Sequence, residues 1–262
     1  MKYTIYQVDA FAEHLFSGNP AAVVPLTHWL SDDLLQKIAA ENNLSETVYY
    51  IINGDSIDIR WFTPNTEVDL CGHATLAAAY VLHTQENFQQ PVIPFYSSRS
   101  GNLPVTVLSN GYTLNFPKDR LEEVAITEEL KSTTTRTPIK AYKGKTDYML
   151  VFKDQSDIAT LQPNLSVIER LNARGLIVTA KGEQVDFVSR FFGPQCGVNE
   201  DPVTGSAHTT LTPYWSEVFN KESLVAIQLS SRQGKLQCKL VGDRVEIAGQ
   251  AVLYMKGEIN IE

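Results

Sequence analysis

The chain has 262 residues, of which 43% are apolar and 20% charged, a composition typical of a globular protein. A net charge of −8, without any basic run, argues against nucleic acid as a partner. No apolar stretch approaches the roughly 18 residues of a membrane span, and the N-terminus lacks the apolar core of a signal peptide. The cysteines, Cys71, Cys196 and Cys238, are odd in number and widely spaced, so we expect no disulfide framework and a reducing cytoplasm.

The first half of the chain alternates strand patterns with two helical ones. Ser31, followed by Asp32 and Asp33, predicts the cap and acidic first turn of an amphipathic helix over 31–41. Residues 72–83 are apolar on nearly every side, which predicts a buried central helix. Strand patterns cover residues 3–9, 21–25, 47–52, 56–62 and, with turns expected at 101–102 and 110–111, 91–117.

The second half repeats this arrangement after a polar stretch over 118–137, where we place the join between two domains. Many antiparallel strands around one buried helix, twice over, predict an α+β fold of two domains, 1–117 and 118–250. The last strand, about 251–262, is a candidate to return to the first domain, because chain ends often lie close together. The elements expected in the second half are a short acidic helix over 122–131, strands near 148–152, 175–180 and 186–192, a helix over 205–219 and a three-stranded meander over 235–259.

Two segments about 130 residues apart echo each other. Arg60-Trp-Phe-Thr-Pro64 is followed by Cys71-Gly-His-Ala-Thr75, and Arg190-Phe-Phe-Gly-Pro194 is followed by Thr204-Gly-Ser-Ala-His208. Each combines an aromatic strand, a turn with proline and a small-residue loop that opens a helix. A helix start carries unpaired N–H groups and a partial positive charge. The echo therefore predicts two helix starts that bind a small anion.

Glu46 stands where the predicted helix over 31–41 passes into the strand over 47–52. A carboxylate partly withdrawn from water at such a junction suits proton transfer. A solvated glutamate at a strand edge, or one that caps the helix end, would produce the same pattern. Position alone therefore makes Glu46 a candidate for a general acid or base.

A second group of candidates surrounds the later helix start. Pro202 should hold Asp201 in an extended conformation, while Gly205 permits close backbone approach and Ser206 can donate its hydroxyl. A capped helix with acidic residues near its dipole fits as well, although a cap does not need the glycine. At the first helix start, His73 could contact a substrate carboxylate, relay a proton or simply cap the helix.

The cysteines and histidines suggest neither a metal site nor a pair of catalytic thiols. Cys71 and His73, taken with His208, fit no zinc spacing, so we expect no metal. A thiol at a helix start can act as an acid or base, and a two-base racemase would place a second thiol at the equivalent position of the echo. Residues 202–204 contain no cysteine and Cys196 is out of register, which disfavours a two-thiol mechanism.

Together these segments resemble the PhzF-like (phenazine biosynthesis) protein family, a branch of the diaminopimelate epimerase-like fold. The matching pieces occur in family order and run from residue 8 to the C-terminal meander. They are Val8-Asp-Ala-Phe11, Gly18-Asn-Pro-Ala-Ala-Val23, Leu44-Ser-Glu-Thr47, Arg60-Trp-Phe-Thr-Pro64, Cys71-Gly-His-Ala-Thr75, Glu200-Asp-Pro-Val-Thr-Gly-Ser-Ala-His208 and Ser231-Arg-Gln-Gly234.

The resemblance implies two pseudo-symmetric domains, each wrapping a mostly antiparallel sheet around a central helix, with the active site in the cleft between them. It implies that Glu46 is the general acid and base. The other site residues it implies are His73 and Asp201 as catalytic groups and Gly72, Gly205 and Ser206 as substrate-binding groups. It also implies a homodimer that needs neither a metal nor an organic cofactor.

From these observations we expect a cofactor-independent isomerase that moves a proton on a small carboxylic acid. One alternative is a one-base epimerase or racemase of an amino or hydroxy acid. Another is a non-catalytic protein that binds small anions at the helix starts. An intact Glu46, which anion binding does not need, favours the enzyme. The substrate itself is not predicted by the sequence.

Overall fold

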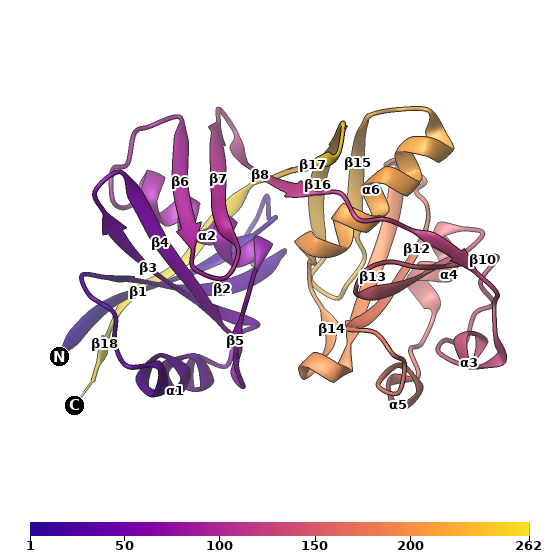
Figure 1. Cartoon of the computed structure of the whole chain (residues 1–262), viewed down its shortest axis with the longest axis horizontal. Helices are drawn as coiled ribbons and strands as arrows, with labels where there is room; N and C mark the ends of the chain where they lie inside the picture. The colour runs from indigo at the N-terminus through magenta and orange to yellow at the C-terminus, as the bar shows by residue number, and fades with distance from the viewer. Residues whose placement is uncertain (262) are drawn as a thin grey trace. The chain divides into compact units, whose positions relative to one another are not determined.

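The computed structural model describes residues 1–261 and divides the chain into two units of similar build (Figure 1). Unit 1 consists of Met1–Asn115 together with the chain from Ala248 onward, and unit 2 of Phe116–Ile247. The chain passes from unit 1 into unit 2 along β8 (Gly111–Pro117) and returns along β17 (Arg244–Gly249). In each unit, strands surround one central helix.

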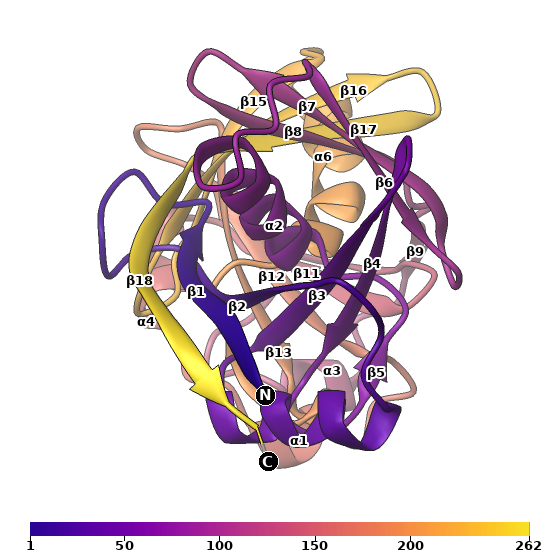
Figure 2. The ribbon, with the colours of Figure 1, turned by 90° about the vertical axis from the view of Figure 1, so that its left-hand side faces the viewer.

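Unit 1 surrounds α2 (Gly72–Thr84), whose 13 residues include nine that are buried, His73 among them. Figure 2 shows α2 with the strands of this unit around it. An apolar helix without a polar side has to be covered in this way, as the sequence predicted. The strands of unit 1 besides β8 are β1 (Lys2–Ala10), β2 (Asn19–Leu26), β3 (Glu46–Asn53), β4 (Ser56–Phe62), β5 (Glu67–Val68), β6 (Val92–Ser97), β7 (Gly101–Leu108) and β18 (Ala251–Asn260).

The first and last strands of the chain lie side by side in this sheet. β18 pairs antiparallel with β1 from Lys2 opposite Asn260 to Ala10 opposite Ala251, with a register shift between Gln7 and Val8. β1 also pairs with β2, so the C-terminal strand is held directly beside the N-terminal hairpin.

α1 (Asp32–Asn42) leads the chain to Glu46. Ser31 caps its start by accepting a hydrogen bond from Leu34, and Asn43 ends it in a left-handed conformation with φ 48°. The buried face of α1 packs on β3, where the Tyr49 hydroxyl donates to the carbonyl of Leu35 at 2.7 Å. The reversal after α1 therefore delivers Glu46 as the first residue of β3.

Unit 2 surrounds α6 (Gly205–Phe219), which is fastened to the sheet by a hydrogen bond of 2.9 Å from Trp215 Nε1 to Thr179 Oγ1. None of the helices in residues 1–261 combines the length and apolarity that a membrane span needs. The other elements of unit 2 are β9 (Glu122–Val124), α3 (Glu128–Lys131), β10 (Lys140–Lys143), β11 (Asp147–Val151), α4 (Gln155–Thr160), α5 (Leu165–Ile168), β12 (Gly175–Lys181), β13 (Phe187–Gly193), the 3-10 helix η1 (Pro194–Cys196), β14 (Val198–Asp201), β15 (Ser223–Gln228) and β16 (Gly234–Val241).

The strands of the two units share one pairing pattern. In unit 1, the pairs β1–β2, β2–β3, β3–β4, β4–β6 and β6–β7 alternate between antiparallel and parallel. In unit 2, the pairs β10–β11, β11–β12, β12–β13, β13–β15 and β15–β16 follow the same alternation. Each unit also adds a short antiparallel strand just before its helix, β5 on β4 and β14 on β13. The two similar segments of the sequence thus occupy equivalent positions in two units of the same topology.

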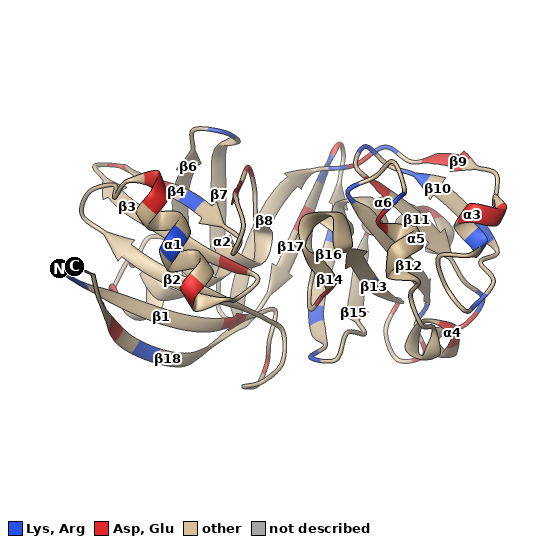
Figure 3. Ribbon diagram, turned by 90° about the horizontal axis from the view of Figure 1, so that it is seen from below, with Lys and Arg blue, Asp and Glu red and all other residues tan. Residues whose placement is uncertain are grey.

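Two local predictions were wrong. Residues 122–131 do not form one acidic helix, because pairing with β10 draws the first three of them into β9 and Thr127 then caps a separate α3. Figure 3 shows acidic residues on both elements. The turns between β6, β7 and β8 lie at 98–100 and 109–110, earlier than expected, since Gly101 already begins β7 with a φ of 73°.

His208 is fully buried in α6, and its Nδ1 donates a hydrogen bond of 2.9 Å to the Thr204 carbonyl, the carbonyl of the N-cap residue. Burial disfavours the imidazolium and lowers the pKa of His208 from 6.5 to about 4. The folded protein therefore keeps this histidine neutral at pH values where an unfolded chain would protonate it.

This buried histidine predicts acid destabilisation of unit 2. Its contribution is fully present above pH 6.5 and is lost as the pH falls from 6.5 toward 4, because only the unfolded state takes up a proton there. The loss should reach about 3 kcal/mol. Urea denaturation of wild type and His208→Gln at several pH values measures it. The difference between the two proteins should shrink as the pH falls through this window; a difference that does not change with pH would contradict the prediction.

Candidate active site

The starts of two neighbouring strands and of the central helix meet in unit 1. β2 and β3 run parallel with Ala21 opposite Glu46, and α2 begins beside them with His73 in its first turn. Oε2 of Glu46 lies 3.0 Å from Nε2 of His73. The Glu46 side chain is 15% exposed and that of His73 only 5%, so part of the Glu46 side chain reaches solvent, while its Oε2 and the imidazole are enclosed.

Asn19 completes the surroundings of His73. It is the fully buried first residue of β2, and its side-chain nitrogen lies 3.2 Å from His73 Nδ1. The preceding Gly18 has a φ of 67°, and a Cβ there would lie 2.2 Å from the carbonyl oxygen of Ala10. Only glycine fits this approach. The turn at Gly18 therefore sets the position of Asn19 against the imidazole.

Cys71 is the N-cap residue of α2, and its Sγ lies 3.5 Å from Nδ1 and 4.0 Å from Nε2 of His73. Burial, together with the charge of Glu46, raises the pKa of this thiol to about 11. At neutral pH Cys71 is therefore a protonated, uncharged group, which is a poor base and a poor nucleophile.

His73 is shifted toward its charged form. Burial alone lowers its pKa, but the interactions with Cys71 and with the negative Glu46 carboxylate, including a hydrogen bond to each, raise the pKa well above 6.5. Because the Cys71 thiol stays protonated at neutral pH, Glu46 is the negative charge that stabilises the imidazolium there. An imidazolium donates from both nitrogens, so Asn19 has to turn its amide from the orientation in the structure, where its nitrogen faces Nδ1, and present its oxygen instead.

The N-cap residue at the start of α2 forms no side-chain cap. Cys71 has an extended backbone and makes no capping hydrogen bond to the first turn. The N–H groups at Gly72 and His73 therefore point out of the helix without a side-chain acceptor, which suits a carboxylate of a bound molecule.

In unit 2 the start of α6 is built from other residues. Asp201 ends β14 in the extended conformation that Pro202 was expected to impose, and its Oδ2 accepts a hydrogen bond of 2.5 Å from Thr204 Oγ1. The N–H of Thr204 donates to Oε1 of the buried Gln228 at 2.8 Å. α6 then begins at Gly205, again without a side-chain cap.

The predicted site residues thus form two sets. Unit 1 brings Glu46 together with Gly72 and His73 at the start of α2, and unit 2 gathers Asp201, Gly205 and Ser206 at the start of α6. Sequence reasoning did not single out Asn19 or Gln228. The first belongs to the segment Gly18-Asn-Pro20, whose turn-forming residues were a usable signal, whereas nothing in the sequence marked Gln228.

Three side chains of the unit 1 site, those of Glu46, Cys71 and His73, could together hold a cation. Donor atoms of Glu46, Cys71 and His73 all lie within 4.8 Å of one another. The spacing of Cys71 and His73 could not indicate this grouping, because the third donor comes from β3. A soft divalent ion would need the thiolate form of Cys71, which the raised pKa of the thiol opposes.

Comparison with known proteins assigns the family. Residues 8–257 match the phenazine biosynthesis-like protein family. The chain belongs to this family. It is 47% identical over 261 residues to an uncharacterized isomerase of Pseudomonas aeruginosa and 48% identical over 263 residues to a second one of the same organism, with 100% of each chain covered in both cases.

Solved structures agree with the fold. A crystal structure of a phenazine biosynthesis protein of the PhzF family from Enterococcus faecalis shares 45% sequence identity and a TM-score of 0.97 over 100% of both chains. A predicted epimerase from Pseudomonas aeruginosa has a TM-score of 0.77 at 18% identity, covering 99% of this chain and 100% of that one, which shows a shared fold alone. The expected α+β, diaminopimelate epimerase-like fold is confirmed.

The contact between Glu46 and His73 in this family member predicts a coupled titration. Replacing the carboxylate in Glu46→Gln should lower the pKa of His73 markedly, because burial remains while the stabilising charge is lost. NMR titration of the imidazole signals from about pH 5 to pH 9 measures the shift, with His73 assigned from a His73→Gln spectrum. Glu41→Gln, an exposed glutamate at the end of α1, is the matched control. An unchanged His73 titration in Glu46→Gln would show that the pair is not coupled.

Proposed function

We propose that this protein is a cofactor-independent isomerase that moves a proton on a small carboxylic acid, with Glu46 as the general acid and base. The observation that carries the proposal is the partly exposed Glu46 side chain, whose Oε2 lies 3.0 Å from an enclosed His73 at the start of a helix without a side-chain cap. A group that accepts a proton and a group that binds a carboxylate are then side by side.

The proposed reaction has two steps. The Glu46 carboxylate removes a proton from a substrate carbon, and the electron pair of that C–H bond moves into the substrate as an enolate-like system. The Glu46 carboxyl group then returns the proton to another carbon, where a new C–H bond forms. One residue acts as base and then as acid, so atoms and charge balance without a further reactant. A positioned proton donor or acceptor contributes roughly 10²–10⁴-fold to the rate.

His73 and the first turn of α2 support both steps in this proposal. The N–H groups at Gly72 and His73 bind the substrate carboxylate and stabilise the negative charge that develops during proton removal. The imidazole, held by Asn19 at Nδ1, keeps the Glu46 carboxylate oriented through Nε2. For Gly205 and Ser206 at the start of α6 we propose substrate-binding roles, supported by the second helix start without a side-chain cap and by the resemblance, and for Asp201 beside them the catalytic role that the resemblance implies.

The comparisons support the class of reaction. Relatives at 47% and 48% identity over their full length are named isomerases. Membership in the phenazine biosynthesis-like family spans nearly the whole chain, including both helix starts.

Deuterium exchange tests the role of Glu46. Wild type is incubated in D₂O with a panel of small acids: α-amino acids and α-hydroxy acids of both hands, and unsaturated cyclic carboxylic acids. Proton NMR should show loss of a C–H signal, and Glu46→Gln should slow this exchange by roughly 10²–10⁴-fold. Glu41→Gln, the exposed control, should exchange like wild type. Full exchange in Glu46→Gln would refute the assignment of the base.

The same experiment separates the alternatives. Exchange with inversion at the carbon next to the carboxylate, seen as loss of optical activity, would identify a one-base epimerase or racemase. A double bond that changes position would identify the proposed proton shift. Binding of the acids without exchange in wild type would indicate an anion-binding protein without catalysis.

Cys71 should be dispensable for this chemistry. Its thiol is protonated at neutral pH, and the equivalent position at the start of α6 is Thr204. Cys71→Ser should therefore lose less activity than the roughly 10²-fold that removal of a general acid–base group costs. The measurement is the same deuterium exchange. A loss as large as that of Glu46→Gln would instead place the thiol in the proton transfer.

A further inference from the structure

In both units an arginine binds a glutamate through two parallel hydrogen bonds of the same geometry. Arg60 of β4 donates from Nε to Oε1 of Glu67 at 2.7 Å and from Nη2 to Oε2 at 2.9 Å. Arg190 of β13 donates from Nε to Oε1 of Glu200 at 2.7 Å and from Nη2 to Oε2 at 2.9 Å. These two arginines open the echoed segments of the sequence. We call each arginine–glutamate pair a clamp.

The clamps also share their aromatic support. The guanidinium carbon of Arg60 lies 5.1 Å from the ring centre of Phe62, and that of Arg190 lies 5.0 Å from the ring centre of Phe192. In each case the ring belongs to the residue two positions further along the same strand. The guanidinium is thus packed against an aromatic ring and hydrogen-bonded along its edge, and that of Arg60 also lies 5.4 Å from the ring centre of Trp29, so its orientation is fixed.

Each clamp holds the chain just before a helix start. Glu67 lies in β5 and Cys71 is the N-cap of α2, while Glu200 lies in β14 and Thr204 is the N-cap of α6. From glutamate to N-cap the chain advances four residues in both units, 67 to 71 and 200 to 204. Because this spacing is the same, each arginine holds its glutamate at an equivalent place, and so fixes the position of the segment that leads into the helix.

Burial indicates that the clamps fix geometry more than they add stability. The side chains of Arg60 and Glu67 are 19% and 14% exposed, and those of Arg190 and Glu200 are 12% and 27% exposed. The desolvation of such pairs offsets much of their attraction, so an apolar pair could stabilise the fold equally well. Two parallel hydrogen bonds, by contrast, specify the relative position of two segments.

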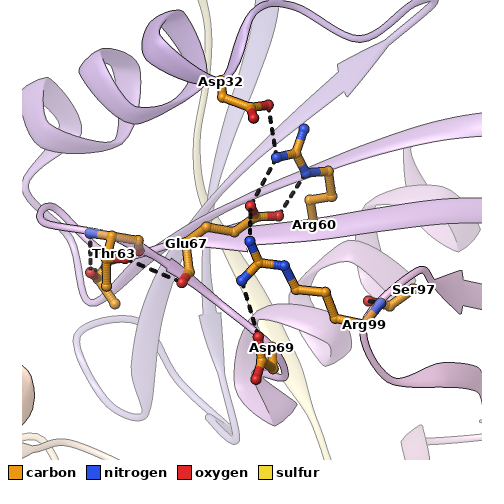
Figure 4. A network of polar contacts seen from close by, with 8 residues as sticks. Asp32, Arg60, Thr63, Glu67, Asp69, Ser97 and Arg99 are labelled. Carbon is orange, nitrogen blue, oxygen red and sulfur yellow. Dashed lines mark hydrogen bonds and ion pairs between the residues drawn. The ribbon is translucent and has the colours of Figure 1, made fainter.

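In unit 1 the clamp is extended by further ion pairs, as Figure 4 shows. Nη2 of Arg60 also donates to Asp32 at the start of α1 at 2.9 Å. Arg99 donates to Glu67 at 2.7 Å and to Asp69 at 3.0 Å, so it grips the segment before α2 at two points.

In unit 2 the remaining donors of the clamp go to the backbone. Nη1 of Arg190 donates to the carbonyls of Ile158 and Leu161, at 3.2 and 2.9 Å. These residues belong to α4 and its C-terminal end. Each clamp therefore joins three segments: its strand, the approach to the helix start, and a helix that precedes β3 or β12.

We propose that Arg60 and Arg190 are positioning residues with different kinetic roles. Arg60 positions the start of α2, which carries His73 beside Glu46 and also the N–H groups proposed to bind the substrate carboxylate, so it controls both kcat and KM. Arg190 sets the start of α6, with Gly205 and Ser206, so it controls substrate binding and hence KM. The division of roles rests on the proposed function; the positioning itself rests on the clamp geometry.

The test replaces each arginine by lysine, which keeps the charge but cannot make two parallel hydrogen bonds. The probe is whichever acid of the panel exchanges deuterium with wild type. Arg60→Lys should lower kcat by roughly ten- to 10²-fold and raise KM as well, whereas Arg190→Lys should raise KM by a similar factor with little change in kcat. Arg120→Lys, at an exposed arginine, is the control and should match wild type.

Two readouts need no substrate. Arg60→Lys should shift the NMR titration of His73 and the backbone amide signal of Gly72, and leave the amide signal of Gly205 in place. Arg190→Lys should do the reverse. If a lysine variant does not fold, as judged by circular dichroism, Glu67→Gln or Glu200→Gln replaces it, because each keeps the shape of the side chain but removes its charge.

The outcomes distinguish the two proposals. A folded Arg60→Lys protein with unmoved His73 and Gly72 signals overturns the clamp proposal, whatever Glu46→Gln does. Shifted signals in Arg60→Lys together with full exchange in Glu46→Gln leave the clamp standing and refute the proposed base. If Arg60→Lys and Arg190→Lys change kcat by the same factor and KM by the same factor, the division of roles is overturned.

Discussion

The burial of a helix without a polar face is the constraint on which each unit depends. α2 buries nine of its 13 residues, and strands have to surround it because no side of it tolerates water. Along the helix the backbone groups satisfy one another, so only the ends keep free donors and acceptors. Polar chemistry can therefore concentrate at the start of α2, where Cys71 and His73 meet Glu46. The enclosed imidazole and its carboxylate partner are a consequence of how the helix is covered.

The two units share what fixes geometry and differ in what performs chemistry. Their strands pair in the same alternation, and the hydrogen bonds of the two clamps have the same lengths. At the helix starts, by contrast, Cys71 and His73 of unit 1 correspond to Thr204 and Ser206 of unit 2. A duplicated scaffold can keep its positioning contacts while the residues it positions diverge. The relatives named isomerases are similar over the full length of both halves.

Prediction from the sequence worked where the signal was local. The apolar run of α2, the Ser31 cap of α1 and the extended Asp201 before Pro202 each follow from residues next to one another. It failed at 122–131, because pairing with β10 overrides the helical preference of acidic residues. It did not predict that Glu67 and Glu200 bind the two arginines, although each glutamate stands four residues before the N-cap of its helix.

By itself the sequence determined the division into two similar halves, the buried central helices, the small residues at the starts of these helices, and Glu46 as a candidate. These properties depend on periodicity, on small residues and on turn residues, all of which act over a few positions. Only the tertiary structure decided that the Glu46 carboxylate reaches His73 and that Asn19 holds the other side of the ring. Such contacts join residues from β2, β3 and α2, and they exist because parallel pairing of the two strands sets their starts side by side against the helix. No local pattern specifies that pairing, since it is selected by the burial of the whole unit.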